Sequence, residues 1–142
     1  MRLKVFSSLK VYQVTEDRDE WEPLCRRCAE TAGVKYVGSL TQPELPRELR
    51  SVNILAYPNT FAETSCISVM EVLASGCFVL TSKWGYLPET TATFARLISL
   101  SQSNISNSIA PFSSISERES YAQEFLVAIL EVLEVLTAAN PQ

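Results

Sequence analysis

Two short apolar runs constrain the fold of this chain more than any other feature of its sequence. Asn53–Tyr57 (Asn-Ile-Leu-Ala-Tyr) and Cys77–Thr81 (Cys-Phe-Val-Leu-Thr) have the length of strands, and Cys66–Ser75 between them carries apolar residues at helical spacing. Continuous apolar strands are typical of parallel sheets that are buried on both faces. The three segments therefore predict a strand–helix–strand unit within a parallel sheet.

The rest of the first 100 residues repeats this alternation. Further extended runs are expected at Leu3–Ser7, Lys10–Val14, Val34–Val37 and Arg96–Leu100. Further helices are expected at Trp21–Ala32, stopped by Gly33, and at Glu44–Arg50, where Thr41-Gln-Pro-Glu44 has the form of a capping box. Residues 82–95 are rich in turn formers. This order predicts an α/β fold over residues 1–100, a Rossmann-like and mainly parallel sheet flanked by helices.

Two further segments follow. Residues 101–116 are dense in Ser and Asn and are expected to form a linker. Residues 117–138 are expected to form an amphipathic helix, because a capping box at Ser114–Glu117 precedes apolar residues at helical spacing. These apolar residues are Tyr121, Phe125, Ile129, Leu133 and Leu136.

Composition excludes several classes of function. Of the 142 residues, 46% are hydrophobic and the net charge is only −4, which argues against a disordered chain. The isoelectric point near 4.9 argues against nucleic-acid binding, which requires a basic surface. The sequence contains no histidine, so Ser-His-Asp and Cys-His mechanisms and His-ligated metal sites are excluded. Chemistry must therefore use carboxylates, hydroxyls, thiols or backbone groups.

The sequence favours a cytoplasmic protein without a transmembrane segment. The N-terminus has no apolar core or cleavage site of a secretory signal, and no apolar run approaches the length of a membrane span. The four cysteines are therefore expected to be reduced and mostly buried. Cys25-Arg-Arg-Cys28 has C-x-x-C spacing, but a structural role is favoured over zinc or redox chemistry, since no second pair follows.

The loop after Asn53–Tyr57 is the best candidate for a binding site. In open parallel sheets, ligands bind beyond the carboxyl ends of the strands. Thr64 and Ser65 are natural N-cap residues, so backbone N–H groups at the start of the following helix are suited to a phosphate. The alternative is that these two residues merely cap the helix.

Two carboxylates accompany this loop. Glu63 precedes the helix and Glu71 lies eight residues later, just over two helical turns, which is expected to place Glu71 on the side of the early helix residues. Such a pair flanking a phosphate site suits a polyhydroxylated ligand with a diphosphate. The alternative is that Glu71 is solvated and Glu63 complements the helix dipole.

The segment from Tyr57 to Gly76 resembles the signature of the group 1 glycosyltransferases, which have the GT-B fold and retain anomeric configuration. Their Glu-x7-Glu motif corresponds to Glu63 and Glu71, and their later Gly-x-x-Pro-Glu motif to Gly85-Tyr-Leu-Pro-Glu89. Val37-Gly38-Ser39 is similar to the family's turn near the nucleotide base. The resemblance covers about residues 1–100 and identifies the family rather than the base, the sugar or the acceptor.

The resemblance implies a role for each matching residue. Glu63 would be the catalytic residue and would meet hydroxyls of the donor sugar, Glu71 would meet the ribose, and Gly38 would leave space for the base. The diphosphate would meet main-chain N–H groups of Thr64, Ser65, Cys66 and Ile67. No metal and no cofactor is implied, because the nucleotide-diphospho-sugar is the donor substrate.

Two departures from the family's pattern limit this interpretation. The strand and helix that carry the Arg/Lys diphosphate clamp of the family are missing, and so is the N-terminal acceptor-binding domain. The chain thus resembles a truncated C-terminal, nucleotide-sugar-binding domain of a hexosyltransferase, and is expected to be inactive alone. The alternative is a non-catalytic Rossmann-like binding or interaction module derived from that fold, docking on a partner through its C-terminal helix. A flavodoxin-like receiver fits poorly, because no acidic cluster follows the first strand.

Trp84 and Tyr86 flank Gly85 close to the candidate site. Stacking on a sugar and partial packing into the core are both compatible with their positions, and packing is favoured.

Overall fold

The structure, a computed structural model, describes residues 2–6, 22–100, 112 and 114–139. The chain divides into two compact units, residues 1–47 and residues 48–142. The extended run expected at residues 10–14 and most of the linker expected at residues 101–116 lie outside the described residues. The limits of the expected domains remain a prediction.

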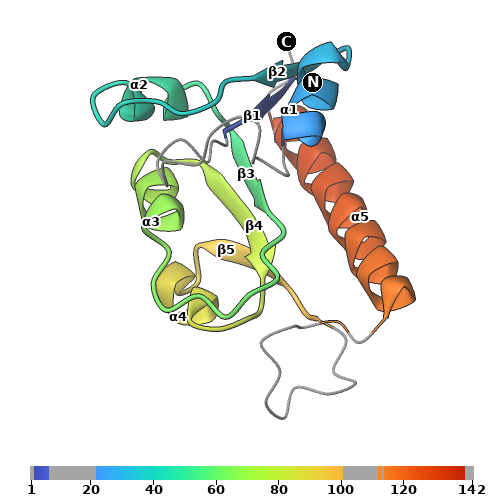
Figure 1. The fold of residues 1–142 in the computed structure, drawn as a ribbon. Coiled ribbons are helices and arrows are strands. Elements are labelled where there is room, and N and C mark those ends of the chain that lie inside the picture. Colours follow the sequence, from blue (N-terminus) through green and yellow to red (C-terminus); the bar gives the residue numbers. More distant parts are fainter. Residues whose placement is uncertain (1, 7–21, 101–111, 113, 140–142) are drawn as a thin grey trace. The chain divides into compact units, whose positions relative to one another are not determined.

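The first unit contains one strand–helix–strand motif. Strand β1 (Leu3–Val5) pairs in parallel with β2 (Val34–Tyr36), and α1 (Glu22–Glu30) lies between them in sequence (Figure 1). Gly33 follows α1 with a φ of +82°, a left-handed conformation that favours glycine at a helix end. The expected parallel arrangement is confirmed for this pair.

A short helix, α2 (Leu45–Leu49), ends at the start of the second unit. The Thr41–Glu44 pair precedes it: the Thr41 N–H donates to the Glu44 carboxylate at 2.9 Å, and the Thr41 hydroxyl donates to the same oxygen at 2.6 Å. These bonds lower the pKa of Glu44. The predicted contact between the two side chains is therefore present, but the hydroxyl acts as a donor rather than as the acceptor of the usual capping box.

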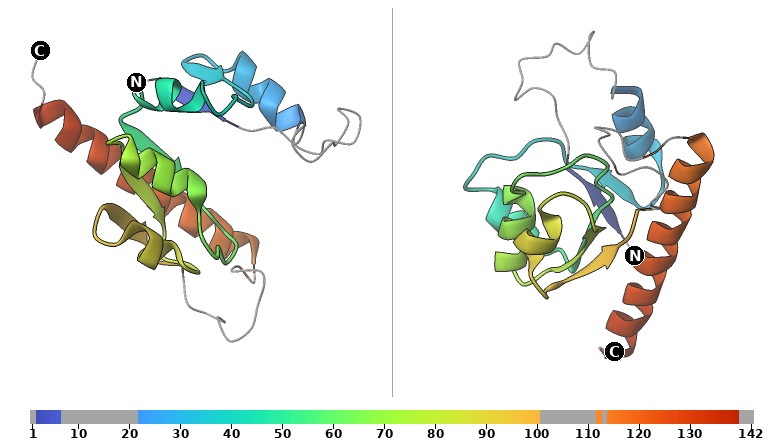
Figure 2. Two further views of the ribbon diagram at one scale, coloured as in Figure 1. Left: turned by 90° about the vertical axis from the view of Figure 1, so that its left-hand side faces the viewer. Right: turned by 90° about the horizontal axis from the view of Figure 1, so that it is seen from below.

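The second unit is a three-layer arrangement around a parallel sheet. Its strands are β3 (Ile54–Tyr57), β4 (Phe78–Ser82) and β5 (Ala95–Ile98), and β4 lies between the other two. Helices α3 (Ile67–Ala74) and α4 (Leu87–Thr91) lie on one face, and α5 (Ile115–Ala139) lies on the other (Figures 1 and 2). The α/β fold with parallel sheets flanked by helices is confirmed, with one small sheet in each unit.

One expectation for the second unit is wrong, and one of its helices was not predicted. Strand β3 was expected to be buried on both faces, yet all four of its residues are only half-buried, because β3 is an edge strand of this sheet. The turn-rich segment 82–95 contains α4, for which Pro88 in the first turn, followed by Glu89, is the sequence signal. By contrast, the central strand β4 is buried, as its apolar run predicts.

The core of this unit lies between the sheet and α5. A cluster of buried side chains from β4, β5 with the residues just after it, and α5 forms this core: Leu80, Ile98, Leu100, Tyr121, Phe125 and Ala128. The rings of Tyr121 and Phe125 meet edge to face with centroids 5.8 Å apart. The helix expected at residues 117–138 is present as α5, and the Glu117 N–H donates to the Ser114 hydroxyl at 3.2 Å, as the capping box predicts.

Burial of Tyr121 makes the core sensitive to alkaline pH. Burial raises the pKa of its phenol from 10 to about 12, so the folded state holds this proton more tightly than the unfolded state. The stability that this proton provides is complete below pH 10 and is lost as the pH rises from 10 to about 12. Between pH 9 and pH 11 the chain should therefore lose about 1 kcal/mol more unfolding free energy than Tyr121→Phe, which keeps the ring. Urea titrations at both pH values measure the difference, and equal losses would contradict the assignment.

Candidate functional site

The loops that follow β3 and β4 are joined by a hydrogen bond between their main chains. Because the two strands are parallel neighbours, both loops leave from the same edge of the sheet, where α/β folds bind ligands. The Tyr86 N–H donates to the Glu63 carbonyl at 2.9 Å. The structure thus brings together Glu63 and the Gly85 loop, which the sequence related only through a motif pattern.

Gly85 is required at this contact for two reasons. Its φ is +58°, where side chains are strained, and a Cβ would lie 2.7 Å from both the nitrogen and the oxygen of Glu63. Main-chain atoms cannot move aside as the end of a flexible side chain can. The glycine therefore allows the two loops to approach closely.

A buried asparagine shapes the loop that carries Glu63. Asn59 is 6% exposed; its amide donates to the Phe61 carbonyl at 2.6 Å and accepts from the Phe61 N–H at 3.2 Å. Its own N–H donates to the Tyr57 carbonyl at 2.8 Å. Sequence analysis did not single out Asn59, although Pro-Asn after a strand is a turn signal.

The Glu63 carboxylate accepts a side-chain hydrogen bond. The phenol of Tyr57, the last residue of β3, donates to Glu63 Oε1 at 2.7 Å, and both side chains are half-buried. Burial and, after it, the hydrogen bond to Glu63 raise the pKa of Tyr57 well above its ordinary value. Sequence reasoning missed Tyr57 as a site residue, because the pairing depends on the fold of the loop between them.

Helix α3 begins later than expected. Its N-cap is Cys66, in an extended conformation, whereas Thr64 and Ser65 were predicted to cap it and instead lie exposed ahead of it. No described oxygen side chain caps α3, although the Cys66 sulfur interacts with the Val69 N–H, and the first turn contains no acidic residue. Ile67, the first helical residue, is 69% exposed. The helix therefore starts at the surface, without the side-chain oxygen acceptor that most N-termini have.

Two of the four free cysteines are buried: Cys66 at the start of α3, and Cys77 just before β4, at the opposite end of the strands from the candidate site. Burial raises the pKa of Cys66, which therefore remains a thiol and is a poor nucleophile. Burial also raises the pKa of Cys77, whose thiol donates to the Val52 carbonyl at 3.0 Å. Cys25 and Cys28 are only half-buried on α1, so the expectation of burial holds for one pair and fails for the other.

The geometric argument that linked Glu71 to Glu63 does not hold. Residues 63–66 are not helical, so the eight-residue spacing does not represent two turns of helix. Glu71 lies half-buried on α3, and its carbonyl accepts from the Ser75 hydroxyl at 2.8 Å. Its contact with a ribose remains a prediction.

Gly38 belongs to the first unit, just after β2, with a φ of +74°. A Cβ there would approach only the Tyr36 ring, at 3.8 Å, so the requirement for glycine comes from the backbone conformation and not from crowding. Its role beside a base remains a prediction.

The two aromatic residues around Gly85 have different environments. Trp84 is partly buried and packs against the core cluster, as the favoured alternative predicts. Tyr86 is 58% exposed. Of the two rings, that of Tyr86 is the more open to a ligand.

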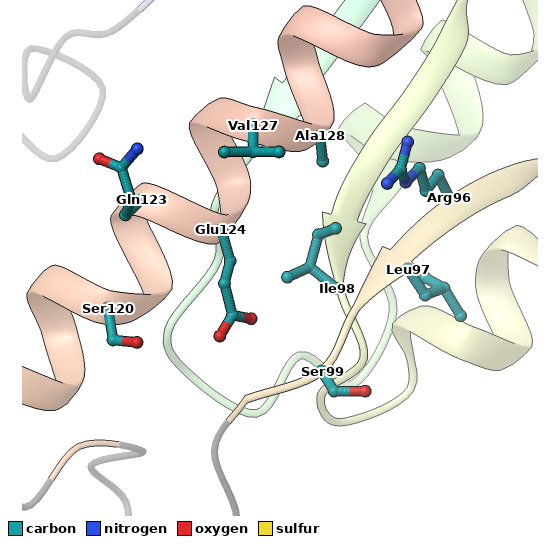
Figure 3. Close-up of a pocket in the computed structure, with 9 residues that line it drawn as sticks. All are labelled: Arg96, Leu97, Ile98, Ser99, Ser120, Gln123, Glu124, Val127 and Ala128. Atoms are coloured by element: carbon teal, nitrogen blue, oxygen red, sulfur yellow. The ribbon is translucent and has the colours of Figure 1, made fainter.

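A separate, open hollow of about 550 Å³ lies between β5 and α5 (Figure 3). It is lined by residues of both elements and contains none of the predicted site residues. Arg96, at its rim, forms an ion pair with Glu131. The hollow is therefore distinct from the loops that carry Glu63 and Gly85.

Among residues 2–6, 22–100, 112 and 114–139, no three His, Cys, Asp or Glu side chains form a group that would hold a metal ion. Among the helices of the same residues, none has both the length and the apolarity that crossing a bilayer requires. Metal independence remains a prediction.

Comparison with known proteins identifies no relative: no family model, no curated protein and no solved structure matches this chain.

The contact between the two loops predicts a large difference between two glycine substitutions. Gly85→Ala should lower the free energy of unfolding by about 2–4 kcal/mol, because the clash with Glu63 adds to the cost of the positive φ. Gly76→Ala is the matched control, since its φ is +79° but no heavy atom lies within 4 Å of its Cβ position. The control should lose only about 1–2 kcal/mol. Urea denaturation measures both, and similar losses would show that the close approach costs little.

Proposed function

We propose that this chain is the nucleotide-sugar-binding part of a retaining glycosyltransferase of the hexosyltransferase type, corresponding to the C-terminal, Rossmann-like half of a GT-B fold. The observation that carries the proposal is the junction of Glu63 with Gly85, which joins the two motif loops at the carboxyl ends of adjacent parallel strands. Their main-chain contact is what a site that uses both motifs together requires.

The start of α3 is suited to the diphosphate. Its first N–H groups have no side-chain oxygen cap among the described residues, and the helix dipole adds a partial positive charge there. Main-chain N–H groups of residues 64–67 would donate to the phosphate oxygens. One helix terminus contributes only about 0.3–2 kcal/mol, so the isolated chain should bind a nucleoside diphosphate weakly.

Glu63 would be the residue that meets the donor sugar. A carboxylate only accepts hydrogen bonds, so it pairs with sugar hydroxyls and fixes the orientation of the ring. In the complete enzyme, the bond from the anomeric carbon to the diphosphate would break, a bond to the acceptor oxygen would form on the same face, and the proton of the acceptor hydroxyl would pass to the departing diphosphate. Positioning of the sugar and stabilisation of the departing diphosphate would supply the rate enhancement, without a metal.

Glu71 would accept from the ribose hydroxyls, and Gly38 would adjoin the base. The acceptor would be bound by a further domain, so the chain by itself would hold the donor without transferring the sugar. The cytoplasm is the proposed location.

A second candidate function is favoured by one side of α5. While Tyr121, Phe125, Ala128 and Val132 are buried, Leu126 and Leu130, which lie one helical turn apart, are about half exposed. A non-catalytic interaction module would use this side of the helix to bind a partner.

Ligand titrations followed by NMR distinguish the two candidates. We expect amide signals of residues 63–71 to shift saturably, at millimolar concentration, with one of UDP, GDP or ADP and with its glucose or mannose conjugate. Glu71→Ala should weaken binding of that nucleotide about tenfold, because hydrogen bonds to a charged group contribute about 1.5–3 kcal/mol.

Glu134→Ala is the matched control for this experiment. It removes the same charge from an exposed position of α5 and should leave the titration unchanged. If a well-folded chain shows no shift with any of the nucleotides or conjugates, the glycosyltransferase proposal is wrong and the interaction module becomes the better explanation.

A further inference from the structure

We infer that Tyr57 is a positioning residue: its phenol holds the Glu63 carboxylate in the orientation that receives neutral sugar hydroxyls. This inference rests on the proposed function of Glu63. It adds a residue outside the sequence motifs and specifies the chemistry of the sugar group that the site accepts.

The main chain of Tyr57 is fixed from two directions. Its carbonyl accepts from the Thr81 hydroxyl of β4 at 2.8 Å and from the Asn59 N–H at 2.8 Å. Thr81 is fully buried and Asn59 nearly so. Because the backbone of Tyr57 is held at the end of β3 and its side chain is half-buried, the position from which the phenol donates to Glu63 is fixed.

Glu63 is also held at both ends. Its carbonyl accepts from the Tyr86 N–H, its backbone packs against Gly85, and its Oε1 accepts from Tyr57 at 2.7 Å. A glutamate side chain normally loses considerable rotamer freedom when it binds a ligand. Here much of that freedom is already lost before the sugar arrives, so less binding energy is spent on ordering the carboxylate.

The direction of the Tyr57 hydrogen bond defines what Glu63 can bind. The phenol donates to Oε1 and the Cys66 thiol also interacts with the carboxylate, whose remaining lone pairs are left as acceptors. A ligand must therefore present donors, as neutral hydroxyls do. A carboxylate or phosphate on the sugar at this position would face the negative charge of Glu63 without a shared proton.

The experiment is a set of titrations of the full chain with UDP, GDP and ADP and with UDP-glucose, GDP-mannose and ADP-glucose, followed by NMR. For the pair that binds, Tyr57→Phe should raise the Kd of the sugar conjugate about three- to tenfold and change the Kd of the diphosphate less than twofold. In a Glu63→Ala background, Tyr57→Phe should have no further effect, because it acts through the carboxylate.

Tyr121→Phe is the matched control. It also removes one phenol oxygen and keeps the ring, but Tyr121 belongs to the core cluster between the sheet and α5 and not to the candidate site. Both Kd values should therefore stay within twofold of those of the unsubstituted chain.

If Tyr57→Phe does not fold, a measurement on the unsubstituted chain takes its place. The ¹³Cζ signal of Tyr57 should shift with the sugar conjugate and not with the diphosphate, since only the sugar is expected to reach Glu63.

The outcomes separate this inference from the function on which it rests. If the unsubstituted chain binds neither diphosphates nor conjugates, the proposed function fails and the inference fails with it. Suppose instead that the unsubstituted chain binds both the diphosphate and its sugar conjugate. If Tyr57→Phe then weakens binding of the two ligands equally, or weakens binding of neither, Tyr57 only supports the loop and the inference alone is overturned. Selective loss of the sugar conjugate supports it.

Discussion

The contact between Gly85 and the backbone of Glu63 is the constraint on which the candidate site depends. Without a side chain at residue 85, the loop after β4 approaches the loop after β3 closely enough for Tyr86 to donate to the Glu63 carbonyl. A hydrogen bond between main-chain groups fixes position without depending on a flexible side chain. The sheet places two loops at one edge, and the glycine lets their main chains come close enough to form this hydrogen bond.

The central strand explains why this edge is stable enough to carry a site. β4 is buried by α5 on one face and by α3 and α4 on the other, and Thr81 near its end is fully buried although polar. Its hydroxyl donates to the Tyr57 carbonyl, so burial of this polar group is compensated by a bond that orders the neighbouring loop. The core and the site therefore share a strand, and the polar end of that strand belongs to the site.

The sequence predicts the elements of this structure better than their surroundings. Apolar runs and helical periodicity predict β4, α3 and α5, because those patterns arise within one segment of chain. The half-burial of β3 was not predictable, since it depends on which strands pair on each side. The same limit applies to the site. Glu63 and Gly85 were found through motifs, whereas Tyr57 and Asn59 act through hydrogen bonds that exist only once the loop is folded.

The difference between the predicted and the observed start of α3 shows how tertiary hydrogen bonds decide which groups are left for a ligand. Local preference favours Thr64 or Ser65 as the cap, and an acidic residue such as Glu63 is well suited to complement a helix dipole. In the folded chain the carboxylate instead accepts from Tyr57, and the helix begins at Ile67 behind the buried Cys66. Had either hydroxyl capped the helix, or had the carboxylate turned toward it, the first N–H groups would already have an acceptor. The fold thus keeps the carboxylate and the helix terminus as separate functional groups, one suited to hydroxyls and the other to an anion.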